Sequence, residues 1–207
     1  MRKPDEIMAE SFRIIEAEVG AHTFDALEWP VVRRIIHAAG DLDLAAAVSF
    51  HGHAARVGVE ALQQGIPLVS DVRMVATGIR QQLLAELGCT LHCFIDAPEV
   101  QQLAHRTGRT RSYCAMHKAI TEVGTAVYVI GNAPTALMAL CQGVRQGLVR
   151  PRLIVAMPVG FVSVVESKEE ALTLDVPVIT IRGRKGGSAV AAATINALLL
   201  LAQQGKA

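Results

Sequence analysis

The stretch Val127-Tyr-Val-Ile-Gly-Asn-Ala-Pro-Thr-Ala-Leu137 decides the fold class of this chain. Its first four residues are β-branched or aromatic and predict a buried strand, and residues 135–142 have the pattern of a helix. Between them, Gly131 permits a sharp turn and Pro134 suits the first turn of a helix. The stretch therefore predicts a strand, a tight turn and a helix N-terminus, whose free backbone N–H groups would favour an anion. The same pattern also fits an ordinary strand-to-helix turn that binds no ligand.

Strands and helices continue to alternate on both sides of this stretch. Apolar runs predict further strands at 66–70, 90–95, 153–157 and 177–181, with helical patterns between them. Such alternation, at least five times over, predicts an α/β fold with a mostly parallel sheet and helices on both faces, a Rossmann-like three-layer sandwich. We expect a single domain, residues 1–207, with a helical N-terminal part at 1–50 and an alternating α/β body at 51–207.

Composition and charge balance exclude several classes of protein. Hydrophobic residues make up 51% of the 207 residues and charged residues 19%, which suffices for a core and argues against disorder. Lys and Arg number 20 against 19 Asp and Glu, so nothing points to a nucleic-acid partner or a polybasic membrane anchor. The longest apolar run, residues 189–202, is interrupted by Thr194 and Asn196 and falls short of the ~18 apolar residues of a membrane span. We expect a buried helix there.

Cysteine usage and the first residues of the chain predict a cytoplasmic protein. Four cysteines form no CxxC pair and fall inside predicted helices and strands: Cys89, Cys93, Cys114 and Cys141. Two of them flank His92, but no second ligand pair follows at a structural-zinc spacing, so we expect buried free thiols and no metal. Residues 1–6 have no apolar run after their basic pair, so they are not a signal peptide.

Three loops at the carboxyl ends of predicted strands combine glycine with polar residues: 131–135, 158–163 and 182–188. Gly186 and Gly187 permit close backbone approach, and Ser188 is a suitable N-cap for the next helix. Together these loops favour a ligand with several acidic groups. Since Lys185 precedes the glycine pair, the last loop is not G-x-x-x-x-G-K-[ST], and no G-x-G-x-x-G occurs in the chain. Both facts count against a nucleotide-dependent enzyme.

Two polar positions near predicted element boundaries allow more than one interpretation. Asp71 ends a predicted strand and begins an expected loop at 71–78, where it would either cap the next turn or contact a ligand. Arg111 lies before a predicted helix with Ser112 as its N-cap, which fits an anion site or a solvated basic turn.

The N-terminal part offers polar residues of its own. Arg34 and His37 share one face of a predicted helix at 31–39, although His37 would also simply interact with the helix dipole. Ser11, inside a predicted helix at 5–19, would ordinarily be a neutral surface residue. His51 and His53 would suggest a metal if they shared a strand face, but no carboxylate or cysteine accompanies them nearby, so we interpret them as solvated loop histidines.

An ordered set of motifs across nearly the whole chain resembles the precorrin-8X methylmutase family, called cobalt-precorrin-8 methylmutases in the anaerobic route. The set comprises Ser11-Phe12 with Ile14-Ile15, Arg34-Ile-Ile-His37, Asp71-x-x-Met-Val-x-x-Gly-Ile79, Thr110-Arg-Ser112, Gly131-Asn-Ala-Pro-Thr-Ala-Leu137, Met157-Pro-Val-Gly-Phe-Val162, Glu166-Ser-Lys168 and Gly183-Arg-Lys-Gly-Gly-Ser188. Phe50-His-Gly-His53 departs from the Ser/Pro-type turn common in the family. One short motif would be weak evidence, whereas the ordered set is highly specific.

The resemblance implies a homodimeric α/β enzyme of cobalamin biosynthesis. Such an enzyme moves a methyl group from C-11 to C-12 of the corrin macrocycle, giving hydrogenobyrinic acid or its cobalt counterpart, and needs no redox cofactor or methyl donor. Two alternatives stay open: a non-catalytic corrinoid carrier on the same scaffold and, from the fold alone, a nucleotide-dependent enzyme.

The resemblance also implies roles for three residues. It makes His37 the acid–base residue and places Ser11 and Arg34 in contact with the substrate. The acetate and propionate arms of a corrin suit several anion-binding loops, so on chemical grounds we add four further contacts: Arg111, Asn132, Gly186 and Ser188.

Overall fold

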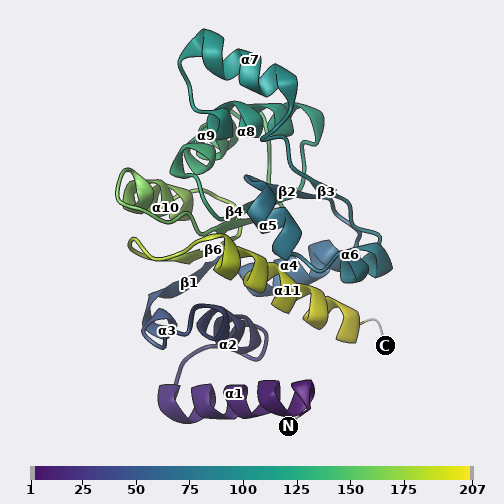
Figure 1. Cartoon of the computed structure of the whole chain (residues 1–207), viewed down its shortest axis with the longest axis vertical. Coiled ribbons are helices and arrows are strands. Elements are labelled where there is room, and N and C mark those ends of the chain that lie inside the picture. Colours follow the sequence, from purple (N-terminus) through teal and green to yellow (C-terminus); the bar gives the residue numbers. More distant parts are fainter. Residues whose placement is uncertain (1–2, 206–207) are drawn as a thin grey trace.

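The sheet contains six strands and is parallel except at one edge. The computed structural model describes residues 3–205, within which the strands lie in the order β1-β6-β5-β4-β2-β3 (Figure 1). Their bounds are β1 (Val48–His51), β2 (Leu68–Ser70), β3 (Leu91–His92), β4 (Val127–Ile130), β5 (Leu153–Ala156) and β6 (Val178–Ile181). Strand β1 runs antiparallel to β6, and the other pairs are parallel. The predicted α/β fold is confirmed.

The five parallel strands are doubly wound. The chain passes from β2 outward to β3, then crosses back over β2 to β4 and continues through β5 to β6. The direction of winding therefore reverses between β2 and β4. In open α/β sheets, the crevice at such a switch point, outside the carboxyl ends of the strands, is the usual place for a ligand.

Helices cover both faces of the sheet, as the sequence predicts (Figure 1). One face carries α2 (Glu28–Ala39), α4 (Ala54–Gln63), α5 (Arg73–Gly78), α6 (Gln81–Leu87) and α11 (Ser188–Gln204). The other carries α8 (Arg111–Glu122), α9 (Pro134–Arg145) and α10 (Val164–Leu172), with α7 (Pro98–Thr107) packed on α8. Helix α1 (Pro4–Val19) lies outside α2, and the short α3 (Leu44–Ala47) leads into β1.

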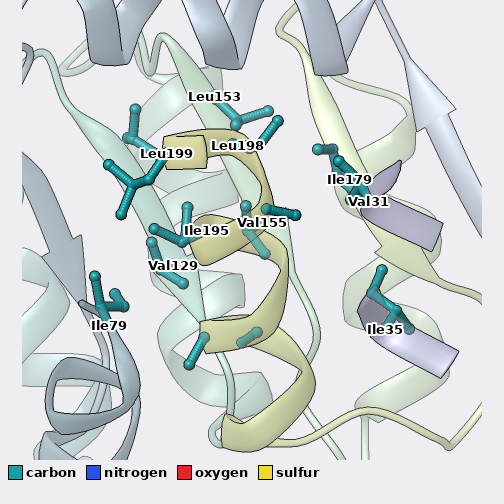
Figure 2. Close-up of a cluster of buried hydrophobic side chains, with 14 of the residues drawn as sticks. Val31, Ile35, Ile79, Val129, Leu153, Val155, Ile179, Ile195, Leu198 and Leu199 are labelled. Carbon is teal, nitrogen blue, oxygen red and sulfur yellow. The ribbon is translucent and has the colours of Figure 1, made fainter. Parts of the chain in front are cut away.

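Alternate side chains of each strand enter two separate apolar cores. In β4, Val127 and Val129 join the core on the α11 face, whereas Tyr128 and Ile130 join the core on the α9 face. Figure 2 shows the first core, in which α11 side chains lie over the central strands: Ile195, Leu198 and Leu199 with Val129, Leu153 and Val155. Because both faces of β4 are buried, its sequence is continuously apolar, which made this strand easy to predict.

Three local predictions differ from the structure. Residues 73–78 form helix α5 instead of a loop, because Val75 turns into the α11-face core and its burial favours a helical turn. The ambiguous segment 41–48 forms α3 and the start of β1, so the boundary that we drew at residue 50 falls inside β1. Strand β3 covers two residues where the sequence predicts six, at 90–95. Among the residues described, no helix is long and apolar enough to cross a membrane, and the run at 189–202 is the largely buried α11.

Candidate functional site

Helix α11 connects the two groups of candidate residues. It is flanked by α2 on one side and by α5 and α6 on the other (Figure 1). Helix α2 runs antiparallel to α11. Near the start of α2, Pro30 lines the same cavity as Gln204 at the end of α11, and just past the end of α2, Asp41 forms an ion pair at 2.6 Å with Lys185, which precedes α11. Residues in the middle of α2 therefore lie alongside the middle of α11.

The first group lies where α1 meets α2. The Phe12 ring lies at the centre of this group. The His37 ring packs edge-on against it, with 5.6 Å between the two ring centroids. The guanidinium carbons of Arg33 and Arg34 lie over the same ring, 4.1 and 5.0 Å from its centroid. Ser11, next to Phe12, donates its hydroxyl proton to the Ile7 carbonyl at 2.9 Å. The structure thus brings Ser11, Arg34 and His37, which sequence resemblance alone had grouped, to one helix–helix junction.

Arg34 is a half-buried cation without a carboxylate partner among the side chains that the structure describes, those of residue 3 and residues 6–205. Its Nη1 contacts the Met8 sulfur at 3.4 Å. Burial lowers the pKa of Arg34, and the positive charges of Arg80 and Arg33 lower it further. Arg33, in contrast, forms an ion pair with Glu16. A cavity of about 250 Å³ opens beside these residues: its lining comprises Phe12, Pro30, Arg33, Arg34, Ala197, Leu200, Leu201 and Gln204.

The second group lies at the carboxyl ends of the strands. Of the two interpretations of the 131–135 turn, the one with free backbone N–H groups for an anion is wrong. The buried Asp71, at the end of β2, accepts three backbone N–H bonds: from Gly131 at 2.9 Å, Asn132 at 2.9 Å and Ala133 at 2.8 Å. Burial raises the pKa of Asp71, and the three amide donors oppose that rise. The protein's own carboxylate therefore occupies the amides that the sequence suggested for a ligand. The Asn132 side chain is exposed.

The 183–188 loop is packed tightly against the end of β5. A β-carbon on Gly186 would lie 2.6 Å from the Met157 carbonyl oxygen, and the Gly187 N–H donates to that oxygen at 2.8 Å. Glycine is therefore required at 186 for close approach, as predicted. The predicted N-cap role of Ser188 is wrong: α11 begins at Ser188 itself, and Gly187 is the residue before it. The Ser188 side chain is buried, since the loop folds back on β5.

The turn that carries Arg111 is joined to the start of α9. The Thr110 and Thr135 hydroxyls share a hydrogen bond at 2.8 Å. Thr110, and not Ser112 as predicted, is the N-cap of α8, because its Oγ1 accepts the Tyr113 N–H at 3.2 Å. Arg111 is exposed in the first turn of that helix. A β-carbon on Gly131 would lie 2.9 Å from the Ser188 Cα, so the 131–135 turn also abuts the start of α11.

Comparison with known proteins identifies the family. The sequence model of precorrin-8X methylmutase matches residues 6–201. The chain belongs to the precorrin-8X methylmutase family. A cobalt-precorrin-8 methylmutase of Priestia megaterium is 40% identical over 98% of this chain and 90% of its own. A precorrin-8X methylmutase of Pseudomonas aeruginosa is 38% identical over 96% of both. The crystal structure of precorrin-8X methylmutase from Thermus thermophilus has a TM-score of 0.88 and 41% identity, covering 97% of this chain and 99% of that one.

In this methylmutase-family chain, Lys168 is a structural residue of the site whose burial the sequence did not reveal. Its side chain is 0% exposed, and its ammonium donates to the carbonyl oxygens of Gly183 at 3.0 Å and Lys185 at 2.6 Å. Burial lowers the pKa of Lys168 to about 8. Its two hydrogen bonds therefore hold the 183–188 loop in place. Lys168 belongs to one of the motifs that resemble the family, but a lysine in an amphipathic helix is ordinarily expected to be exposed.

No metal centre gathers in the part of the chain described: no three His, Cys, Asp or Glu side chains are placed to hold an ion. His51 and His53 are both exposed, and His53 precedes α4 in a left-handed conformation. Of the four free cysteines, three are buried and Cys93 is half-buried.

Proposed function

We propose that this protein catalyses the migration of a methyl group from C-11 to C-12 of precorrin-8X or cobalt-precorrin-8, giving hydrogenobyrinic acid or its cobalt counterpart. The observation that carries the proposal is the junction of α1 and α2. There the His37 ring lies edge-on to Phe12 and the Arg34 guanidinium lies over the same ring, in a chain that belongs to the methylmutase family. The relatives compared above are named for this reaction or its cobalt form.

His37 is the proposed acid–base residue. Protonation of the conjugated ring gives it cationic character, which lowers the barrier to methyl migration. The bond from C-11 to the methyl carbon breaks, the bond to C-12 forms, and the proton then returns to the imidazole, so the product is an isomer of the substrate. Histidine suits both steps because it exchanges protons near neutral pH. The exposed ring of His37 on α2 is accessible to a bound macrocycle.

Arginine and polar groups are proposed to hold the acidic arms of the substrate. Arg34 supplies a charge-assisted contact to a peripheral carboxylate, and Ser11 contributes a hydroxyl from α1. Arg111 and the Asn132 side chain, both exposed, are proposed as further contacts near the start of α11. Gly186 and Ser188 complete the proposed set: they shape the backbone there.

We further propose a cytoplasmic homodimer. Exposed apolar side chains support self-association, since Phe161 and Val162 are 84% and 80% exposed and Ile7 and Ile14 lie exposed on α1. Sedimentation equilibrium of the purified protein tests this directly, and a single species at the mass of one chain at micromolar concentration would rule it out.

The decisive experiment separates an enzyme from a corrinoid carrier. We expect His37→Ala to lower turnover of precorrin-8X by roughly 10²–10⁴-fold, the usual contribution of a general acid–base residue. We expect its affinity for hydrogenobyrinic acid, measured by absorbance titration, to stay within about threefold of wild type. His105→Ala, an exposed histidine on α7, is the matched control. If His37→Ala turned over substrate like the control, the acid–base assignment would fail and a carrier would fit better.

A further inference from the structure

Arg80 lies on the opposite side of α11 from α2, at the junction of α5 and α6. Asn196 of α11 holds this junction in place: its Oδ1 accepts the Arg80 N–H at 2.8 Å, and its Nδ2 donates to the Gly78 carbonyl at 2.8 Å. The next residue of α11, Ala197, lines the cavity that Arg34 borders from the α2 side. The segments that carry Arg34 and Arg80 therefore meet α11 at consecutive residues.

The two arginines form an unbalanced pair of positive charges. Arg80 meets α11 at Asn196 and Arg34 borders Ala197, so both side chains start from neighbouring positions along α11, and the positive charge of Arg80 lowers the pKa of Arg34. Among the described side chains of residue 3 and residues 6–205, no carboxylate forms an ion pair with either of them. Arg33, on the same helix as Arg34, does have such a partner in Glu16. Two like charges held together raise the free energy unless an anion lies between them.

The outer surface of α11 carries short side chains near these charges. Ala189, Ala193 and Asn196 recur at helical spacing on the part of α11 that is not fully buried. These short side chains would keep a macrocycle edge close to the helix axis. By the antiparallel register of α2 and α11, His37 lies about one turn from Arg34, toward the start of α11.

We propose that Arg34 and Arg80 together bind one peripheral carboxylate of the corrinoid, an inference that rests on the proposed function. Arg80 is the new assignment. Each guanidinium presents a planar fork of donors that matches a carboxylate, and a carboxylate between them would remove their repulsion. Because this subsite lies one helical turn from His37, the arm it holds decides which edge of the ring faces the acid–base residue. The pair is thus a specificity determinant as well as a binding site.

The test is product binding by single and double variants. We would titrate wild type, Arg80→Gln, Arg34→Gln and the double variant with hydrogenobyrinic acid at low and high salt. We expect Arg80→Gln to raise Kd roughly tenfold at low salt and less at high salt, because Arg80 is exposed and screened. The double variant should bind less weakly than the product of the two single effects predicts, because both arginines act on one carboxylate. Thermal unfolding checks that each variant is folded, and Arg80→Lys provides a conservative second variant.

Two controls make the result specific. Arg56→Gln removes an exposed arginine on α4, outside the proposed site, and should bind like wild type. Hydrogenobyrinic acid with its carboxylates converted to primary amides should bind wild type and Arg80→Gln equally. If Arg80→Gln matched Arg56→Gln while Arg34→Gln weakened binding, the shared subsite would be refuted and the proposed function would stand. If wild type bound neither hydrogenobyrinic acid nor its cobalt form, the proposed function itself would fall, and this inference with it.

Discussion

Two polar clusters lie around α11, and they differ in whether the protein satisfies them. At the switch point, the Asp71 carboxylate is matched by three backbone amides and is buried with them. Near the middle of α11, Arg34 on the α2 side and Arg80 on the α5–α6 side have no carboxylate partner among the side chains described, and His37 is exposed. A cluster whose donors and acceptors match is complete without a ligand and serves the fold. A cluster of cations without carboxylate partners has its charge balanced only when an anion binds.

This difference supports a proposed ligand site whose reacting centre lies away from the usual place in doubly wound folds. The crevice between β2 and β4 ordinarily exposes amides for a phosphate. Here Asp71 closes that crevice with a negative charge, which argues against the nucleotide-dependent alternative on physical grounds. The candidate site lies instead along α11 and α2. A chain can thus keep the scaffold and place its chemistry on a different part of it.

The largest expected effect comes from opening the closed cluster. Asp71→Ala leaves three N–H donors without a partner, of which those of Gly131 and Ala133 are buried and that of Asn132 is half-buried. At roughly 1–3 kcal/mol for each buried donor, we expect the free energy of unfolding to fall by about 2–6 kcal/mol. Urea unfolding followed by circular dichroism measures it. Asp96→Ala, which removes an exposed carboxylate paired with Arg73, should cost less than about 1 kcal/mol. Equal losses in the two variants would mean that Asp71 is not what holds the 131–133 turn.

The second effect is a pH dependence from Lys168. Its pKa falls from 10.5 to about 8 in the folded protein, so between those values the unfolded state binds more protons than the native state. Stability from this group therefore rises as the pH increases from about 8 to 10.5. Relative to Lys168→Met, wild type should gain up to about 3 kcal/mol over that range, since each pH unit is worth about 1.4 kcal/mol. Urea unfolding of both proteins at pH 7, 8, 9 and 10 tests this, and a constant difference would contradict it.

The smallest expected effect on stability comes from the Thr110–Thr135 hydrogen bond, next to the 131–133 turn. Thr135→Val removes the hydroxyl bond to Thr110 that joins the Arg111 turn to α9, and we expect a loss of about 1 kcal/mol in the free energy of unfolding. Thr125→Val, at an exposed threonine before β4, is the matched control and should change stability by less than about 0.5 kcal/mol. If both variants unfolded alike, the Thr110–Thr135 bond would contribute nothing to the free energy of unfolding.

Sequence patterns predicted the parts of the fold that depend on local burial. Strand β4 was predicted with its observed bounds, because four consecutive buried apolar residues leave no other interpretation. Strand β1 was missed, since Ser49 and His51 give an edge strand a half-polar pattern. Helix α5 was mistaken for a loop because its stability comes from Val75 packing against distant residues. Propensity within a short window does not contain that information.

The site shows the same limit. Residues of the α1–α2 junction were grouped through resemblance, because neither Ser11 nor His37 stands out by residue type or spacing. Asp71 was expected to cap the turn that follows it or to contact a ligand. It instead accepts the amides of the 131–133 turn, some sixty positions later, and this contact depends on the pairing of β2 with β4. Arg80 belongs to no motif that we recognised, and its importance appears only once Asn196 places it beside α11.

The pairing of α2 with α11 also has a consequence for how the chain acquires activity. Helix α2 ends at Ala39, whereas its main packing partner begins only at Ser188. During synthesis, the segment with His37 leaves the ribosome long before the surface that will hold it exists. Contacts of such large sequence separation form late and slowly. The scaffold strands and their Asp71 closure can assemble first, so a nascent chain acquires its shape before it acquires the proposed catalytic group in working position.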